Sequence, residues 1–509
     1  MRLHTFHGGL ALAGHKAEST ARGLQACDLP ALLRVPLLQH AGTPALACVA
    51  AGDDVAAGQR IGIAQGEPSA DVHSPSAGRV LAVEPHALAR FPGMDAPHVL
   101  IQTAGAQPAH ALPPLDWQAA DPAALRERIR AAGVVGLGGA GFPTAGKLSV
   151  ARELLVLNGA ECEPWIACDD ALLRECAEEV VRGGRLMARV VGAGHALLAI
   201  EDTMPEALAA ARAAAAAGVE GQVQVVEVPT RYPAGGERQL IQVLTGREVP
   251  RGGLPRDIGV VVQNVATARA AWRAVALGEA LTSRVVTVTG RGVARPGNFV
   301  VPLGTTVAHL VEQAGGYTPQ AARLLLGGPM MGQALPHDDF PIGKQDNCVL
   351  VLSAEECAVP EPEMPCIRCG DCASACPAQL LPQQLLWHAR AGNLERAQDQ
   401  GLVDCIECGA CDLVCPSHIP LTQAFREAKR AARTRALETQ RALAARDRHD
   451  ARQRRLQRES DERAERHEAR RSGTAGADPV ADAVAAALER ARARRTKPND
   501  TDTDTDTSR

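Results

Sequence analysis

Eight cysteines in two runs are the residues of this sequence whose types and spacing point most clearly to a chemistry. The runs are Cys366, Cys369, Cys372 and Cys376 before Pro377, and Cys405, Cys408, Cys411 and Cys415 before Pro416. Each has the spacing C-x2-C-x2-C-x3-C-P, which is typical of paired 4Fe-4S clusters, where the fourth cysteine of a run binds the partner cluster. The spacing therefore predicts two crossed ligand sets: Cys366, Cys369 and Cys372 with Cys415, and Cys405, Cys408 and Cys411 with Cys376.

Structural zinc and disulfides are the alternatives for these cysteines. Zinc takes four ligands, usually in two separated pairs, and has no use for a third and fourth cysteine so close together. The remaining cysteines have no familiar ligand spacing, and we expect them to be reduced thiols: Cys27, Cys48, Cys162, Cys168, Cys176, Cys348 and Cys357.

The chain has 509 residues, which is too long for a ferredoxin alone and suggests roughly three or four domains. A net charge of -4 and an aromatic content of 2% argue against a nucleic-acid binder. We see no secretory signal and no segment apolar enough to cross a bilayer. Cluster thiolates need a reducing compartment, so we expect a cytoplasmic protein that reaches membranes only through partners.

The elements around the cysteines indicate a multidomain α/β protein. A helix is expected over 121–132, because Asp121 suits the N-cap, Pro122 suits the first turn, and Leu125 and Ile129 share one face. Strands over 154–157, 196–200 and 223–228 alternate with helices over 170–181 and 205–218. A strand over 285–290 and a helix over 306–313 follow, then helices over 382–391 and 394–400 between the cysteine runs.

We therefore expect five regions along the chain. Residues 1–115 form a β-rich module similar to a biotinyl/lipoyl-type β-sandwich, without a lysine between Gln59 and His73 to carry a prosthetic group. The others are an α/β domain (116–282), a ubiquitin-like β-grasp module (283–355), a helical ferredoxin-like domain (356–425) and a charged tail (426–509). The tail is rich in Arg, Ala and Glu, so we expect an exposed helix that frays into disorder.

A glycine-rich loop, Gly136-Leu-Gly-Gly-Ala-Gly141, matches G-x-G-x-x-G, and Glu161 follows about twenty residues later. The dinucleotide-binding fingerprint requires a strand that enters the loop, whereas an amphipathic helix precedes this one. The glycines still allow a phosphate or a flat ring to approach the backbone. A ligand-binding loop and a simple turn both remain open.

Longer strings resemble a known family. The segment from Gly133 to Lys147, followed by Asn158-Gly-Ala-Glu-Cys-Glu-Pro164, is similar to the FMN and NADH site of the 51-kDa subunit of respiratory complex I. The similarity is greater to the C subunit of Rnf/Rsx electron transport complexes. It extends through Tyr232-Pro-Ala-Gly-Gly-Glu-Arg238, Gln263-Asn-Val-Ala-Thr267, the module after Ser283 and both cysteine runs.

This resemblance implies roles for individual residues. The loop at Gly136, Gly138, Gly139 and Gly141 would lie against FMN, with Lys147, Asn264 and Thr267 near its phosphate. Asn158 and Glu161 would face the flavin, Phe142 would stack on the dinucleotide, and Glu163 would contact NADH. Tyr232, Gly235 and Glu237 would complete the pocket. Ala160 and Gly236 stand where the complex I pattern has acidic residues, so contacts there must differ.

The resemblance implies an NADH-dependent oxidoreductase component of an ion-translocating complex (a translocase), with NADH, FMN and two 4Fe-4S clusters. Electrons would pass from NADH through FMN and the clusters to other subunits, at the cytoplasmic face of the inner membrane. Hydride transfer requires no general acid or base, so no catalytic residue is assigned. A cobalamin reductase of the same layout and a non-catalytic iron-sulfur adaptor are the alternatives.

Overall fold

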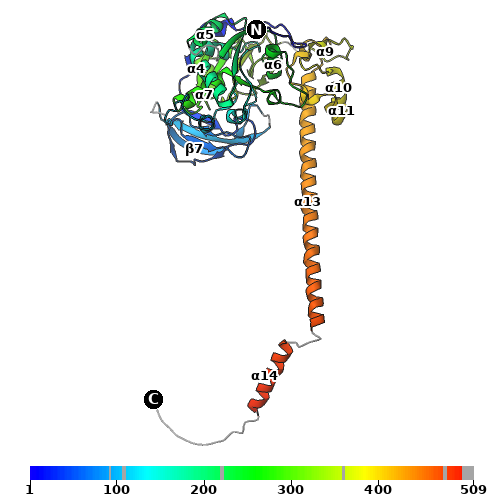
Figure 1. Cartoon of the computed structure of the whole chain (residues 1–509). Coiled ribbons are helices and arrows are strands. Elements are labelled where there is room, and N and C mark those ends of the chain that lie inside the picture. Colours follow the sequence, from blue (N-terminus) through cyan, green and yellow to red (C-terminus); the bar gives the residue numbers. More distant parts are fainter. Residues whose placement is uncertain (91–92, 106–109, 218–222, 358–360, 474–478, 496–509) are drawn as a thin grey trace, which may run out of the picture. The chain divides into compact units, whose positions relative to one another are not determined.

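The computed structural model describes residues 1–90, 93–105, 110–217, 223–357, 361–473 and 479–495 (Figure 1). By its internal contacts the chain divides into two units, Met1–Lys429 and Arg430–Arg509. None of the helices in the described part of the chain has the length and apolar content needed to cross a bilayer.

Two small antiparallel sheets form the N-terminal sandwich. The first has the order β2-β8-β7-β4 and the second has the order β3-β5-β6. Alternate residues such as Leu33, Val35, Val99 and Ile101 are fully buried, as expected for strands with one face on a core. The strands are β2 (Leu32–Pro36), β3 (Leu46–Ala47), β4 (Asp54–Val55), β5 (Arg60–Ile63), β6 (Val72–His73), β7 (Gly78–Ala87) and β8 (Asp95–Thr103).

A four-stranded parallel sheet with the order β11-β10-β9-β12 is the centre of the next domain. Its strands are β9 (Leu154–Gly159), β10 (His195–Glu201), β11 (Val223–Val228) and β12 (Val260–Asn264). Side chains alternate between two cores: Leu155 and Leu157 lie in one cluster and Val156 in another. Both faces of the sheet are therefore covered, as parallel sheets require.

Helices cover the two faces unequally. α4 (Cys168–Val191), α5 (Pro205–Ala216) and α7 (Val265–Ala276) contribute to the first core, whereas α6 (Glu237–Thr245) contributes to the second (Figure 1). The remaining helices are α2 (Pro122–Ala131), α3 (Thr144–Lys147) and the 3-10 turn η1 (Pro255–Ile258). The expected helix at 121–132 is confirmed, and Asp121 caps it by accepting from the Ala123 N–H at 3.1 Å.

The chain order reverses at β9, because β10 lies on one side of this strand and β12 on the other. Ligands of open parallel sheets bind beyond the carboxyl ends of the strands at such a reversal. Asn158 near the end of β9 and Asn264 at the end of β12 lie opposite each other here. The topology therefore indicates a ligand site at the carboxyl ends of β9 and β12.

A six-stranded sheet, ordered β1-β14-β13-β17-β15-β16, forms the β-grasp module together with α8. β1 pairs in parallel with β14, so residues 25–26 join this sheet in space although they lie within the region 1–115 along the chain. The bounds are α1 (Ala17–Thr20), β1 (Gln25–Ala26), β13 (Ser283–Thr289), β14 (Gly297–Pro302), α8 (Val307–Gln313), β15 (Ala321–Leu326), β16 (Gln333–Ala334) and β17 (Cys348–Ser353).

Short helices carry the cysteine runs or connect them. They are α9 (Asp371–Ala375), α10 (Pro382–Arg390), α11 (Leu394–Asp399), η2 (Leu402–Asp404) and α12 (Ala410–Leu413). The next helix, α13 (Leu421–Gly473), begins in this domain, where Phe425 and Ala428 are buried.

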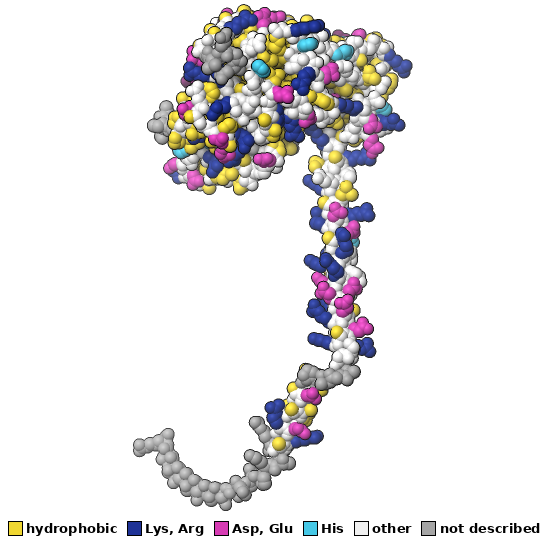
Figure 2. All heavy atoms as spheres, in the orientation of Figure 1, with side chains coloured by type: hydrophobic (Ala, Val, Ile, Leu, Met, Phe, Trp, Pro, Cys, Tyr) yellow, Lys and Arg dark blue, Asp and Glu magenta, His cyan; other side chains and the backbone are white. Residues whose placement is uncertain are grey.

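Beyond Ala432 the side chains of α13 are exposed, and basic and acidic groups are interspersed along it (Figure 2). α14 (Pro479–Arg495) follows. The expected exposed helix is present, and the disorder expected for the end of the tail concerns residues outside those the structure describes.

Candidate functional site

The glycine-rich loop is a tight backbone turn between α2 and α3. The Gly136 N–H donates to the Phe142 carbonyl at 2.9 Å, and Val135 pairs with Pro143. A Cβ added at Gly138 would lie 2.8 Å from Asn264 Nδ2, whereas one added at Gly139 would meet none of the described atoms within 4 Å. The loop is therefore backed by protein on one side and accessible at Gly139, which fits a flat or phosphorylated ligand.

The buried hydroxyl of Thr267, in the first turn of α7, holds this loop. Thr267 Oγ1 accepts from the Leu137 N–H at 2.9 Å and is itself fully buried. Gly141 has a φ of 67° and lies against Gln345, so a side chain there would be both strained and blocked. Phe142 is 40% exposed at the end of the turn. Thr267 is thus a support of the loop, and Phe142 is free to contact a ligand.

Lys147 and Glu237 form an ion pair at the side of the pocket. Lys147 Nζ lies 2.9 Å from Glu237 Oε1 and 3.4 Å from the Val262 carbonyl, which accepts a second bond. Both side chains are partly exposed. The lysine that the resemblance places near phosphate is therefore paired with the glutamate assigned to the same pocket.

Asn158 and Gly235 connect two segments of the predicted site. Asn158 Nδ2 donates to the Gly235 carbonyl at 2.8 Å, and Asn158 Oδ1 accepts from the Ala160 N–H at 3.0 Å. A Cβ at Gly235 would lie 2.5 Å from the Ala160 carbonyl, so only glycine allows this approach. The Gly235 N–H also contacts Cys162 Sγ at 3.3 Å.

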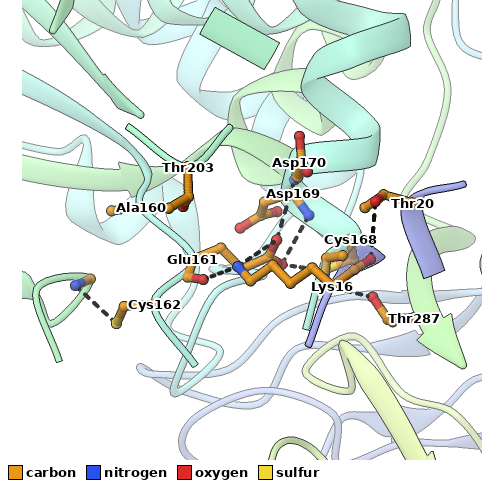
Figure 3. Close-up of polar contacts among 12 residues, drawn as sticks. Lys16, Thr20, Ala160, Glu161, Cys162, Cys168, Asp169, Asp170, Thr203 and Thr287 are labelled. Atoms are coloured by element: carbon orange, nitrogen blue, oxygen red, sulfur yellow. Dashed lines mark hydrogen bonds and ion pairs between the residues drawn. The ribbon is translucent and has the colours of Figure 1, made fainter. Parts of the chain in front are cut away.

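Glu161, which precedes the first residue of α4 by seven positions, caps this helix (Figure 3). Its carboxylate accepts from the N–H groups of Asp169 and Asp170 at 3.0 and 3.3 Å, and from Cys168 Sγ at 3.2 Å. Glu161, Cys168 and Asp169 each place a possible metal-ligand atom within 4.8 Å of the others. Because Glu161 already accepts from helix amides, which favour negative charge at a helix N-terminus, we interpret this cluster as a helix cap.

Two carboxyl groups beside Glu161 have perturbed proton affinities. Burial raises the pKa of Asp169 to about 7, and the neighbouring Glu161 carboxylate adds to this effect. Burial also raises the pKa of Glu201 to about 7, and neither of its oxygens has a hydrogen-bond partner among the described residues. Asp169 Oδ2 accepts from Asn264 Nδ2 at 2.6 Å. Asp169 therefore contacts the residue that lies directly behind Gly138 of the glycine loop.

Glu163 and Tyr232 contact segments of other domains. Glu163 Oε1 accepts from the N–H groups of Met330 and Met331 at 2.8 and 3.0 Å, and burial raises the pKa of this carboxyl. The Tyr232 hydroxyl is buried and donates to the Cys408 carbonyl at 2.6 Å. Tyr232 thereby connects the α/β domain directly to the second cysteine run.

The structure brings the eight cysteines together in two groups of four. Cys366, Cys369, Cys372 and Cys415 line one hollow, and Cys376, Cys405, Cys408 and Cys411 line another. Backbone N–H groups point at some of the sulfurs, as at Leu380 N to Cys376 Sγ, 3.4 Å. Each hollow thus offers four sulfur donors, and its residues fit a 4Fe-4S cluster.

Lys16 is a residue of this region that the sequence did not point to. Its ammonium donates to the Glu161 carbonyl and lies 3.9 Å from Glu161 Oε2 (Figure 3). The two residues are 145 positions apart, and a single lysine before a short helix carries no local signal. Only the fold brings it to Glu161.

Four family models match successive parts of the chain. They are an RnfC barrel sandwich hybrid domain over residues 4–106, a Nuo51 FMN-binding domain over 129–273, an SLBB domain over 285–334 and a 4Fe-4S dicluster domain over 365–419. These matches confirm the expected order of modules and the expectation of FMN and 4Fe-4S clusters. The individual ligands of these groups stay predictions.

Curated relatives are described as the C subunit of an ion-translocating oxidoreductase complex. The protein of Pseudomonas aeruginosa is 47% identical over 91% of this chain and 60% of its own length. Those of Pectobacterium atrosepticum and Salmonella arizonae are 43% and 44% identical over 96% of this chain and 70% and 72% of their lengths. The chain spans about 60% of the length of the first of these relatives.

A solved NAD+-reducing [NiFe]-hydrogenase in its air-oxidised state is also similar. It is 23% identical, with a TM-score of 0.45, over 62% of this chain and 66% of the hydrogenase chain. At this level the likeness does not bear on function.

Proposed function

Because the chain belongs to the family formed by the C subunits of ion-translocating oxidoreductase complexes, we propose that it oxidises NADH and passes the electrons to partner subunits. The observation that carries this proposal is the direct bond from Tyr232, in the α/β domain, to the carbonyl of Cys408. The segment at Tyr232, which the resemblance assigns to the pocket, and a cluster loop are thereby held together. The family and the matched models show that the chain is a redox subunit with an FMN-binding domain and a 4Fe-4S dicluster domain.

FMN, when bound, would accept two electrons from a nicotinamide and release them singly to clusters that carry one electron each. The protein's own part is binding and orientation. Gly139 gives a ligand access to the backbone, Thr267 holds the loop by accepting from the Leu137 N–H, and Asn264 lies behind Gly138. Phe142 is exposed beside the loop and is proposed to cover the dinucleotide.

The two cysteine groups are proposed as the crossed cluster ligands. The group containing Cys408 adjoins Tyr232, and three of its four cysteines are buried, whereas Cys366 and Cys369 of the other group are exposed. We therefore place the buried group on the side of the α/β domain and the exposed group on the side of a partner. The subunit would associate with the membrane through its partners, at the cytoplasmic face.

An NADH titration tests the proposal. The full chain is reconstituted anaerobically with iron, sulfide and FMN, and its absorbance is followed while NADH is added. We expect flavin and cluster bands to bleach together, and NADPH in a parallel titration defines the preference. A protein that retains clusters but no flavin would instead be the iron-sulfur adaptor. Reduction of a corrinoid, without co-purifying membrane partners, would indicate the cobalamin reductase.

A matched pair of glycine variants tests the site. Gly139 and Gly194 both have open space where a Cβ would be added, so valine at either position leaves the described contacts intact. Gly139→Val is expected to weaken FMN binding at least about tenfold, because the side chain would occupy the accessible face of the loop. Gly194→Val, remote in sequence from the loop, is expected to bind FMN normally. Equal affinity of both variants would place the flavin elsewhere.

A further inference from the structure

The N-terminal segment is held firmly against the α/β domain just before Lys16. The Gly14 carbonyl accepts from the Trp165 N–H at 2.7 Å, and the His15 ring stacks on Trp165 with centroids 4.6 Å apart. His15 and Trp165 have φ values of 52° and 70°, in the left-handed region that non-glycine residues rarely adopt. Such conformations persist only where the surroundings enforce them. The position of Lys16 is therefore imposed by the fold.

Lys16 extends from this segment into an acidic part of the candidate site (Figure 3). Its side chain is 16% exposed, and that of Glu161 is 5% exposed. An ammonium and a carboxylate so far removed from water interact much more strongly than a surface pair. Glu161 also accepts from the N–H groups of the first turn of α4. The contact with Lys16 therefore stabilises the Glu161 carboxylate and fixes its position at the start of this helix.

Acidic side chains outnumber basic ones around Lys16. Glu201 is fully buried with both oxygens unpartnered among the described residues, and Asp169 lies against Glu161. Lys16 lowers the pKa of both carboxyls, although burial still leaves each near 7. The charged groups that face these two carboxyls are Lys16, Glu161, Asp170, Asp202 and Arg284.

A continuous series of contacts leads from Lys16 to the glycine loop. Glu161 accepts from the Asp169 N–H, Asp169 accepts from the Asn264 side chain at 2.6 Å, and Asn264 lies behind Gly138. A change of charge at Lys16 therefore alters the electrostatic potential at the backbone of the glycine loop. FMN is anionic through its phosphate, and its reduced form carries further negative charge at neutral pH. Uncompensated carboxylate charge here therefore opposes both the binding of FMN and its reduction.

We infer that Lys16 is a positioning residue of the flavin site: its ammonium fixes Glu161 and offsets the acidic charge behind the glycine loop, so that an anionic, phosphorylated flavin binds and is reduced. This inference rests on the proposed function. It explains how the pocket tolerates several buried acids, and it gives the N-terminal segment a part in cofactor binding.

Flavin-free full-length protein titrated with FMN tests the inference. Lys16→Gln keeps a hydrogen-bond donor for the Glu161 carbonyl but loses the charge, and is expected to raise the FMN dissociation constant about tenfold at pH 8. Lys16→Arg should stay within about threefold of wild type. Arg22→Gln, the loss of an exposed charge in the same segment, should bind FMN like wild type.

The pH profile and the potential separate charge from structure. At pH 6 Asp169 and Glu201 are largely neutral, so the defect of Lys16→Gln should fall to about twofold, and adding Glu201→Gln should restore binding at pH 8. Lys16→Gln should lose more affinity for reduced FMN than for oxidised FMN. Each tenfold difference between the two losses lowers the two-electron midpoint potential of the bound flavin by about 30 mV.

Contrary outcomes are distinct. An unchanged dissociation constant and potential in Lys16→Gln, an equal defect in Arg22→Gln, or a defect independent of pH would overturn the role of Lys16 and leave the proposed function standing. A wild-type chain that binds no FMN would overturn the proposed function itself. Should Lys16→Gln fold poorly by circular dichroism, the charge-balanced double variant and Lys16→Arg still decide the question.

Discussion

The two cysteine runs have the same spacing but different surroundings. Cys366 and Cys369 of the first run are exposed, whereas the corresponding Cys405 is partly buried and Cys408 is buried. Tyr232 donates to the carbonyl of Cys408, and no bond from the α/β domain reaches Cys366 or Cys369 among the described contacts. One motif therefore produces an enclosed cluster site and an accessible one, depending on what packs against it.

The residue in the third position of each run shows the difference in charge. Arg368 and Glu407 both have left-handed backbones, with φ values of 61° and 58°. Arg368 lies over the Trp387 ring at 5.7 Å, while Glu407 pairs with Lys429 at 2.8 Å and Arg426 at 3.1 Å. The same turn geometry thus carries an exposed cation in one run and a paired anion in the other.

The largest expected effect is the loss of one cluster from a single cysteine change. Cys408→Ser and Cys376→Ser should each reduce the iron content from about eight to about four atoms per chain and remove the same signal in electron paramagnetic resonance. Cys369→Ser and Cys415→Ser should remove the other signal. If Cys376→Ser instead resembled Cys369→Ser, the ligation would not be crossed.

Iron removal should separate the two sites next. In Cys369→Ser protein only the enclosed site remains loaded, and in Cys408→Ser protein only the accessible one. A chelator should remove iron from the enclosed site about tenfold more slowly, because the surrounding domain must open first. Release is followed by absorbance of the chelate under anaerobic conditions. Equal rates would show that the packing around Cys408 gives no protection.

Tyr232→Phe should weaken the attachment of the second run. Loss of the buried bond to the Cys408 carbonyl is expected to lower the free energy of unfolding by about 1–2 kcal/mol, measured with denaturant on cluster-loaded protein. The matched control is Tyr317→Phe, since Tyr317 is 44% exposed and donates to Asp338. Its cost should be below about 0.5 kcal/mol. A control as costly as Tyr232→Phe would argue against a special role for the inter-domain bond.

The smallest effect is expected from the third-position residues. Glu407→Gln removes two partly buried ion pairs and should cost about 1 kcal/mol. Arg368→Gln removes an exposed contact with Trp387 and should cost about 0.5 kcal/mol. Thermal unfolding of both variants at matched cluster content measures the difference. A larger loss of stability in Arg368→Gln than in Glu407→Gln would contradict the expected difference between the two runs.

Local features of the fold could be predicted from the sequence. The helix at 121–132 has its cap, its proline and its apolar face within one short segment, and the structure has Pro122–Ala131. The strand over 223–228 is likewise confirmed as β11. In contrast, the helix expected over 170–181 extends to Val191, because the apolar face that continues beyond Val181 packs against α7.

The candidate site was predictable only in part. Spacing and resemblance pointed to Gly138, Asn264 and Lys147, which the structure places around one edge of the parallel sheet. The resemblance placed Glu161 toward the flavin and did not indicate that its carboxylate caps α4. Nor did the sequence indicate that Lys16 reaches Glu161, since the two residues are 145 positions apart.

The sequence by itself determined the kinds of ligand: eight thiolates in two repeated runs, and a glycine loop whose backbone is open. Those features depend on residues close together in the chain, so their spacing is sufficient. Only the tertiary structure decided which run is enclosed, which tyrosine touches it and which lysine meets Glu161. Burial and electrostatic interaction depend on atoms brought together from distant segments, and local spacing carries no information about them.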